Sequence, residues 1–208
     1  MQREIPKAIV PVAGRPILSW ALDAFDPFAF AGIVVIAPPD RLGDVTRILE
    51  GRARVVPGGR TRSESVRLGF EALSPEERDI IVVHDAARPL IAAQEVEAVL
   101  RVAEQTGAAI AAVPLVDTIK RVEEGRILRT IDREGLYGAA TPQAFRADLL
   151  RRALDGRREA TDEAALCEDL GIPVTVVPVS RLTFKITTPE DLQLAEAILR
   201  LRGKGAVP

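Results

Sequence analysis

The sequence predicts an α/β fold in which helices cover both faces of a doubly wound, mainly parallel sheet, giving three layers. Two observations support this prediction. Short aliphatic and β-branched runs alternate along the chain with stretches whose apolar residues recur at helical spacing. The strand-like runs are apolar on both faces, which is typical of parallel strands covered on both sides. With 208 residues, the chain fits one domain spanning residues 1–208.

The first third of the chain predicts two strands between three helices. Residues 16–25 form a helix, because a proline suits its first turn and apolar residues follow at helical spacing. Residues 32–37 form a buried strand, and residues 41–50 form a helix with one apolar face. Residues 54–56 form a short strand, and residues 63–73 form the third helix.

The middle of the chain continues this alternation. Ser74 precedes a proline and two acidic residues, a pattern that begins helices. Residues 80–83, IIVV, form a strand that is apolar on both faces. Residues 93–106 form a helix that ends at Gly107, and residues 108–116 form another apolar strand.

Residues 117–131 interrupt the alternation. Polar and apolar residues alternate there around Glu124-Gly125, which predicts a β-hairpin. We therefore expect a hairpin arm over about residues 117–136. A lone two-stranded arm cannot cover its own apolar side chains, and such an arm often packs on a second subunit.

The C-terminal part returns to helices and strands. Helices are predicted over residues 143–154 and 161–170, the second with a threonine as its cap. Strands are predicted over residues 173–179 and 182–186. The last helix begins at Thr188, a good cap, and runs to about residue 202.

Composition narrows the possible functions. The net charge of −2 gives no general attraction to nucleic acid or to an anionic membrane, and we expect neither as a partner. A single cysteine and a single histidine exclude a disulfide framework and a cysteine-based zinc site. A metal site must then use carboxylates, which favours Mg²⁺ or another hard cation. Residues 27–39, the longest uncharged apolar stretch, are too short to span a membrane, so we expect a cytoplasmic protein.

Candidate functional residues lie where predicted strands end. Asp85 follows the strand 80–83 and needs a partner, either a metal ion or Arg88. Asp117-Thr118 follows the next strand, so we expect it near Asp85 at the same sheet edge. His84 is expected to be a hydrogen-bonded residue at the strand end.

Other candidates allow both a functional and a structural interpretation. Gly58, Gly59, Arg62 and Ser65 join a strand end to a helix start, which suits either a ligand loop or a plain turn. Lys185, on the predicted strand 182–186, is either an exposed edge residue or an anchor for a phosphate. Arg133 is a surface charge by default, and Cys167 is expected to be a packed thiol. The sequence has no nucleophile–base triad, zinc motif or Walker loop, which favours group transfer by positioning and charge neutralisation.

Together these segments resemble the 2-C-methyl-D-erythritol 4-phosphate cytidylyltransferase family over nearly the whole chain. The motifs that carry the resemblance are, in order, Pro6-Lys7, Gly14-Arg15-Pro16-Ile17-Leu18, Gly58-Gly59-x-x-Arg62-x-x-Ser65, His84-Asp85-Ala86-Ala87-Arg88-Pro89, Asp117-Thr118-Ile119-Lys120, Asp132-Arg133-x-Gly135-Leu136, Thr141-Pro142-Gln143, Thr161-Asp162-Glu163 and Lys185-x-Thr187-x-Pro189-Glu190-Asp191. As a set at these spacings the motifs are highly specific.

The resemblance implies a Rossmann-like nucleotidyltransferase that uses Mg²⁺ to join CTP and a sugar-alcohol phosphate, releasing pyrophosphate. It implies that Asp85 binds the metal and that Lys7 stabilises charge on the α-phosphate. It also implies a homodimer in which the arm brings Thr118 and Arg133 to the partner's acceptor site, where they act with Lys185. The residues that it assigns to the nucleotide are Gly58, Gly59, Arg62, Ser65, Ala86 and Arg88.

The sequence departs from the family pattern at one place. Family members have a strand and a glycine-rich loop ending in arginine before the Pro-Lys motif, whereas here Pro6-Lys7 stands almost at the start. We therefore expect the 208-residue form to lack a central strand and to bind CTP poorly, and we expect the gene to encode the loop upstream. Two alternatives remain open at this point: a ribitol 5-phosphate cytidylyltransferase, and an inactive truncated form that lacks the nucleotide loop.

Overall fold

The computed structural model describes residues 6–156 and 158–203; residues 1–5, 157 and 204–208 of the predicted domain lie outside this range. Its main sheet has the strand order β10-β6-β9-β5. These strands span Thr175–Pro178 (β10), Ala108–Pro114 (β6), Tyr137–Arg146 (β9) and Ile80–Val83 (β5). β10 runs parallel to β6, whereas β9 runs antiparallel to both of its neighbours. The α/β class is confirmed, and β9 makes the sheet a mixed one.

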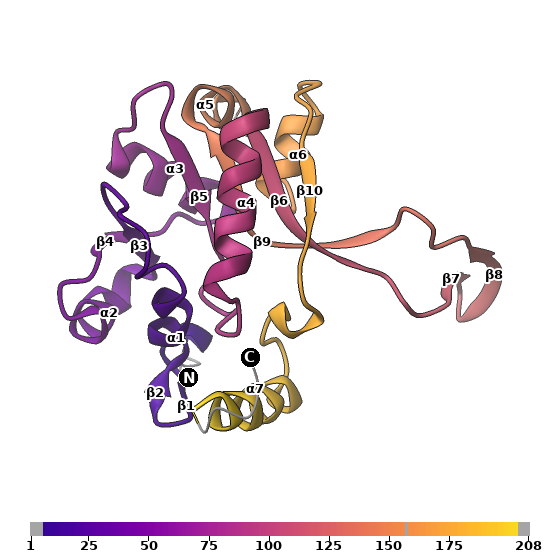
Figure 1. The fold of residues 1–208 in the computed structure, drawn as a ribbon, viewed down its shortest axis with the longest axis horizontal. Helices are drawn as coiled ribbons and strands as arrows, with labels where there is room; N and C mark the ends of the chain where they lie inside the picture. The colour runs from indigo at the N-terminus through magenta and orange to yellow at the C-terminus, as the bar shows by residue number, and fades with distance from the viewer. Residues whose placement is uncertain (1–5, 157, 204–208) are drawn as a thin grey trace.

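Helices cover both faces of this sheet, giving the expected three layers. On one face lies α4 (Ala93–Thr106), which crosses in front of the strands in Figure 1. On the other face, α3 (Arg62–Leu73), α5 (Ala147–Asp155) and α6 (Glu163–Glu168) share one buried cluster with β5, β6 and β9.

The alternation of side chains along β6 shows why the strand is apolar throughout. Ala108 and Ile110 join the cluster under α3, α5 and α6, while Ala109 and Ala111 join the cluster under α4. Successive side chains of a strand point to opposite faces, so a strand covered on both sides is apolar at every position.

A second, two-stranded sheet lies beside the main one. Its strands, β3 (Val34–Ala37) and β4 (Arg54–Pro57), are parallel. They share a buried cluster with α1 (Ile17–Asp23) and α2 (Leu42–Leu49). All four elements match predicted ones, with ends that differ by only a few residues.

The remaining elements extend away from the two sheets. Short strands β1 (Pro11–Val12) and β2 (Arg15–Pro16) pair near α7 (Pro189–Arg202), which Thr188 caps as predicted. β7 (Ile119–Glu123) and β8 (Arg126–Ile131) form the predicted hairpin, which projects from the body in Figure 1. In the described part of the chain, no helix has the length and hydropathy needed to cross a bilayer.

A large open cleft separates the two sheets. It has a volume of about 1430 Å³ and is lined by β3, β5 and the facing sides of α1 and α3. Within the described residues, β3 pairs only with β4, and β5 pairs only with β9. Among residues 6–156 and 158–203, no strand pairs with the edges of β3 and β5 that border the cleft.

Two predictions for the C-terminal half are wrong. Residues 143–146 do not begin a helix but end β9, and α5 begins only at Ala147. Gln143 is polar yet buried in β9. A polar residue is unusual in a buried strand, so the sequence did not predict a strand here. Residues 182–186 are not a strand either, because the backbone N–H of Thr183 donates to the carbonyl of Ser180 in a short 3₁₀ turn, η3 (Arg181–Thr183).

Two predicted helix starts are also corrected. Ser74 does not begin a helix; it ends α3 in the left-handed conformation with φ 49°. Its hydroxyl donates to the carbonyl of Glu71, so the polar side chain serves the end of a helix. Asp162, and not Thr161, caps α6, because its carboxylate accepts the backbone N–H of Ala165.

Candidate functional site

Asp85 lies two residues beyond the end of β5 and is the centre of a cationic cluster. Its side chain is 17% exposed. Lys185 Nζ lies 3.0 Å and Arg88 Nε 3.5 Å from its Oδ2, and Arg62 Nη2 lies 3.8 Å from its Oδ1. Burial by itself raises the pKa of Asp85, but the charge and hydrogen bond of Lys185, followed by the charges of Arg62 and Arg88, lower it below its ordinary value. The carboxylate therefore stays ionised at neutral pH.

The loop before α7 brings distant residues to this cluster. The backbone N–H of Ile186 donates to the carbonyl of Ala87 over 2.8 Å, which ties the loop to the turn after β5. Arg88 Nη1 donates to the Thr183 carbonyl over 2.8 Å, and Lys7 Nζ donates to the Thr187 carbonyl over 2.5 Å. Lys7, Arg88 and the loop that carries Lys185 therefore converge beside Asp85. Burial lowers the pKa of Arg88, against the opposing charge of Asp85.

The glycine loop after β4 is held by its own hydrogen bonds. Ser65 Oγ donates to the Thr61 carbonyl and accepts the backbone N–H of Gly59. A Cβ on Gly58 would lie 3.1 Å from Ser65 Oγ and 3.2 Å from Ile36, so a side chain there requires Ser65 or Ile36 to shift by a few tenths of an ångström. Gly58, Gly59, Ser65 and Ala86 all line the large cleft. The loop thus lines the cleft that Asp85 also lines.

His84, Thr141 and the turn after β5 form a polar network, in which His84 is hydrogen-bonded at the strand end as expected and Thr141 is a partner that was not predicted. Thr141 Oγ1 accepts the backbone N–H of Asp85 and donates to His84 Nδ1, each over 3.0 Å. His84 Nε2 then donates to the Arg88 carbonyl. The sequence signal was a pair of polar residues, Thr141 and Gln143, inside the otherwise apolar run of β9.

Gln143 and Glu163 are two further buried polar residues that were missed. Gln143 Nε2 donates to Asp162, and Gln143 Oε1 accepts the N–H of Ala164, which fixes the start of α6. Glu163 is fully buried and pairs with Arg62. Acidic side chains are common in the first turn of a helix, where they are usually exposed. The residues around Glu163 in the sequence therefore did not predict that its side chain is buried.

Thr118 and Arg133 do not join this cluster within one chain. Thr118 immediately precedes β7, and Arg133 follows β8, so both belong to the arm. Figure 1 shows β7 and β8 far from β5. The prediction that Asp117-Thr118 lies near Asp85 at the same sheet edge is therefore wrong, because β6 continues past that edge into the arm.

The side chains near Asp85 that could bind a metal ion are few. Among the described residues, no group of three or more His, Cys, Asp or Glu side chains could hold an ion by itself. Asp85 lines the large cleft and offers one ionised carboxylate, whose Oδ1 lies 3.8 Å from Arg62 Nη2, beyond hydrogen-bond distance. Such a site fits a divalent cation that takes its other ligands from phosphate groups and water.

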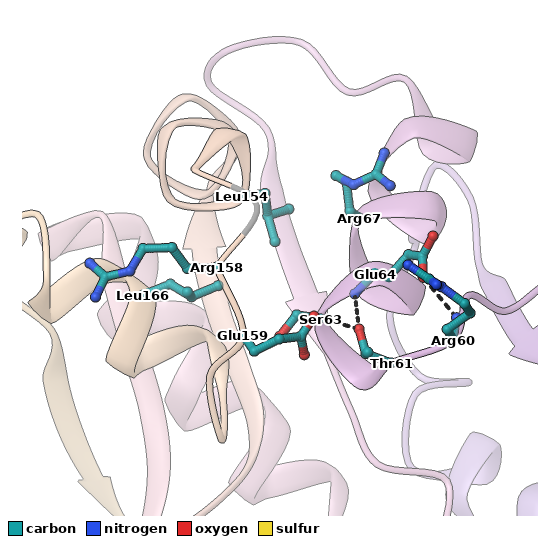
Figure 2. A pocket seen from close by; sticks show the side chains of 9 residues that line it. All are labelled: Arg60, Thr61, Ser63, Glu64, Arg67, Leu154, Arg158, Glu159 and Leu166. Atoms are coloured by element: carbon teal, nitrogen blue, oxygen red, sulfur yellow. Dashed lines mark hydrogen bonds and ion pairs between the residues drawn. The ribbon is translucent and has the colours of Figure 1, made fainter.

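A smaller cleft of about 230 Å³ lies between the start of α3 and the segment joining α5 to α6 (Figure 2). Three arginines line it, and each has a carboxylate partner: Arg60 with Glu64, Arg67 with Glu71 and Arg158 with Asp169. Thr61 Oγ1 also donates to Glu159. The arginines that line this smaller cleft therefore each have their own carboxylate, whereas three cationic side chains share Asp85.

Protonation of His84 is expected to cost folding stability at mildly acidic pH. Burial lowers its pKa from 6.5 to about 4, more than the Arg88 hydrogen bond and the Asp85 charge raise it. As the pH falls from about 6.5 to about 4, the unfolded chain therefore takes up a proton that the folded chain does not. This uptake lowers the free energy of unfolding by up to about 3 kcal/mol.

Urea unfolding at pH 7 and pH 4.5 measures the loss, with His84→Gln as the comparison. We expect the variant to lose less stability between these pH values than the wild type. The lowered pKa of Asp85 adds its own loss only below its ordinary value of 3.8, outside this window. Equal losses in both proteins would show that His84 is not the group that titrates.

Comparisons with known proteins find relatives in one family. The family model described as IspD, 2-C-methyl-D-erythritol 4-phosphate cytidylyltransferase, matches residues 1–201. A relative of that name from Streptomyces coelicolor is 44% identical, covering 95% of this chain and 79% of the relative. One from Pelotomaculum thermopropionicum is 41% identical, covering 97% and 90%. A bifunctional IspD/IspF enzyme from Desulfotalea psychrophila is 42% identical over 96% of this chain, which spans 53% of that enzyme.

Solved structures show the same likeness in three dimensions. The 2-C-methyl-D-erythritol 4-phosphate cytidylyltransferase of Thermus thermophilus superposes with a TM-score of 0.81 at 36% identity, covering 94% of each chain. The enzyme of that name from Francisella tularensis gives a TM-score of 0.83 at 29% identity, covering 93% of each chain. From its sequence and its fold alike, the chain belongs to the 2-C-methyl-D-erythritol 4-phosphate cytidylyltransferase family of nucleotidyltransferases.

Proposed function

We propose that this chain transfers a cytidylyl group from CTP to 2-C-methyl-D-erythritol 4-phosphate, giving 4-diphosphocytidyl-2-C-methyl-D-erythritol and pyrophosphate. Three cationic side chains around one ionised carboxylate, at the end of β5, carry the proposal. Such a cluster suits phosphoryl-type transfer, in which the protein mainly positions reactants and neutralises charge. The match to the family over residues 1–201 selects cytidylyl transfer among such reactions.

In the proposed reaction, a phosphate oxygen of the acceptor attacks the α-phosphorus of CTP. The bond from that phosphorus to the bridging oxygen breaks, and its electron pair leaves with pyrophosphate. Lys7, which is exposed and tethered beside the loop of Lys185, supplies positive charge to the α-phosphate. Lys185 binds the acceptor phosphate and can exchange its contact with Asp85 for that phosphate. Arg88, whose guanidinium also bonds the Thr183 carbonyl, holds the turn and adds fixed charge.

We propose that the base and ribose of CTP lie against the glycine loop. Gly58 and Gly59 leave backbone accessible there, and Ser65 holds that backbone in place. Ala86, a small residue beside Asp85, leaves room for the nucleotide. Arg62 lies at the start of α3, between this loop and Asp85, and faces the phosphates.

Asp85 is proposed to bind Mg²⁺ together with the triphosphate of CTP. A bound divalent cation neutralises charge on the phosphates and so favours departure of pyrophosphate. Mg²⁺ commonly takes one or two protein carboxylates and completes its shell with substrate phosphates and water. A lone ionised carboxylate next to cationic side chains matches that requirement.

The arm is proposed to join two copies of the chain. Val122, Ile127 and Leu128 are 51%, 65% and 54% exposed, which is a high exposure for large apolar side chains on two adjacent strands. Pairing with a second copy covers them and carries Thr118 and Arg133 to the partner's acceptor site. Residues 1–208 are proposed to form one nucleotidyltransferase domain, with the arm at about residues 117–136. With a single cysteine, the chain suits the cytoplasm, where thiols stay reduced.

Pyrophosphate release tests the proposed reaction. The 208-residue chain is assayed with millimolar CTP and Mg²⁺, and with either 2-C-methyl-D-erythritol 4-phosphate or ribitol 5-phosphate as acceptor. We expect release with the first acceptor at a kcat/KM at least about tenfold above that with the second. Preference for ribitol 5-phosphate, or no release with either acceptor, would overturn the proposal.

CTP is expected to bind this form weakly, with a dissociation constant above the micromolar range. The cleft of about 1430 Å³ has a larger volume than typical ligand pockets of about 300–1,000 Å³, so we expect a nucleotide on the glycine loop to leave much of its lining uncontacted. Isothermal titration with CTP measures the affinity, and ATP controls for binding of any triphosphate to the cationic cluster. A micromolar constant for CTP would contradict this expectation.

A further inference from the structure

A buried ion pair joins the starts of two helices beside the site. Glu163 is the first residue of α6, and Arg62 is the first residue of α3, 101 positions earlier. Arg62 Nη1 and Nη2 donate to Glu163 Oε1 and Oε2 over 2.6 and 3.0 Å. The Glu163 side chain is 1% exposed, whereas the Arg62 side chain is 33% exposed and lines the large cleft.

Stability alone is a poor explanation for this pair. Burying the charge of Glu163 and part of the charge of Arg62 costs desolvation that can exceed their attraction, and apolar residues of similar size are often as stable or more so. The position at a helix start favours the carboxylate of Glu163, but it does not call for a guanidinium. Burial opposes the charge of Arg62, yet the hydrogen bond and charge of Glu163, with smaller contributions from Asp85 and Asp162, raise its pKa. Arg62 is thus a permanent, oriented cation.

Arg62 lies opposite one of the two carboxylate oxygens of Asp85. Oδ2 of Asp85 contacts Lys185 and Arg88, whereas its Oδ1 faces Arg62 Nη2 at 3.8 Å. That separation is too long for a hydrogen bond but short enough for a charge interaction. Both terminal nitrogens of Arg62 are directed to Glu163, which keeps the guanidinium from approaching closer.

We propose that Glu163 is a positioning residue that acts through Arg62. It holds the guanidinium away from Oδ1 of Asp85, so that this oxygen stays available to a divalent cation while its charge remains partly balanced. This inference rests on the proposed function of Asp85 as the metal-binding carboxylate. Without the carboxylate of Glu163, Arg62 turns to Asp85 and forms a direct ion pair that competes with the cation.

The variant Glu163→Gln keeps the shape of the side chain and one acceptor but removes the charge. Glu159→Gln is its matched control, because Glu159 contacts Thr61 at the start of the same helix α3 and is exposed. The readout is water-proton relaxation, which rises when a complex of Mn²⁺ with CTP binds the protein. We expect Glu163→Gln to weaken this binding about tenfold, and Glu159→Gln to leave it unchanged.

A second readout separates positioning from a structural role. In Glu163→Gln, the Mg²⁺ concentration for half-maximal pyrophosphate release is expected to rise about tenfold, with most of kcat recovered at saturating Mg²⁺. A merely structural defect lowers the melting temperature and is not recovered by Mg²⁺. If Glu163→Gln does not fold, Arg62→Lys is measured instead, since it keeps the buried carboxylate paired but loses the two-point bond that restrains the cation.

The outcomes are distinct. Wild-type affinity for the Mn²⁺–CTP complex in whichever of the two variants folds overturns the positioning role. The positioning role is supported if Glu163→Gln weakens the affinity for the Mn²⁺–CTP complex while Glu159→Gln leaves it unchanged. The proposed function fails separately, if the wild type binds the Mn²⁺–CTP complex but releases no pyrophosphate with either acceptor.

Discussion

Asp85→Asn is expected to lower kcat/KM for cytidylyl transfer by at least about a thousandfold. Asparagine keeps the size of the side chain but removes the charge that we propose binds Mg²⁺. The lowered pKa of Asp85 means that the wild type has this charge at neutral pH. Pyrophosphate release at several Mg²⁺ concentrations measures the loss, which saturating Mg²⁺ should not restore.

The same substitution also tests the electrostatics of the folded protein. Without Asp85, the cations Lys185, Arg88 and Arg62 lose their shared anion. Because Lys185 and Arg62 keep contact with solvent, we expect a loss of only about 2 kcal/mol in the free energy of unfolding. Sulfate or phosphate should restore part of it, because either anion can take the place of the carboxylate.

Asp79→Asn is the matched control for Asp85→Asn. Asp79 immediately precedes β5, at the opposite end from Asp85, and its carboxylate accepts the backbone N–H of Glu76. We expect this control to keep nearly full activity. Activity of Asp85→Asn within tenfold of the wild type would rule out Asp85 as the carboxylate on which cation binding depends.

Mixing two inactive variants, Asp85→Asn and Arg133→Ala, is expected to restore up to about a quarter of wild-type activity. Arg133 lies in the arm and is proposed to act in the partner's site, whereas Asp85 acts in its own chain. In a mixed dimer, both changes then fall in one site, and the other site is intact. Random exchange makes about half of the dimers mixed, and each has one working site of two.

The control mixture combines Asp85→Asn with Lys185→Ala. These two residues contact each other within one chain, so each mixed dimer has one defect in each site and no activity returns. Sedimentation velocity on differently labelled chains confirms that mixed dimers form. If they form and the first mixture stays inactive, Arg133 does not act in the partner's site. A monomer at assay concentrations would contradict the role of the arm itself.

Local signals in the sequence determined much of the fold and part of the site. The apolar run Ile80–Val83 predicted a strand covered on both sides, and β5 packs on both faces as expected, although its pairing with β9 is antiparallel. Thr188 predicted the start of α7, and Glu124-Gly125 predicted the turn of the arm. Asp85 was predicted to be a functional carboxylate because it follows a buried strand at the edge where ligands bind. In each case the deciding interactions lie within a few residues along the chain.

Strand β9 and the partners of Asp85 were decided only by the tertiary structure. Residues 137–146 have mixed local preferences, and they become a strand because they fill the place between β5 and β6. Lys185 reaches Asp85 through a loop that is tied to Ala87, and Arg62 is held by a glutamate 101 residues away. Such contacts depend on which surfaces meet when helices and strands pack. Hydrophobic burial over the whole molecule decides which surfaces meet. The residues next to these positions along the chain therefore do not predict the contacts.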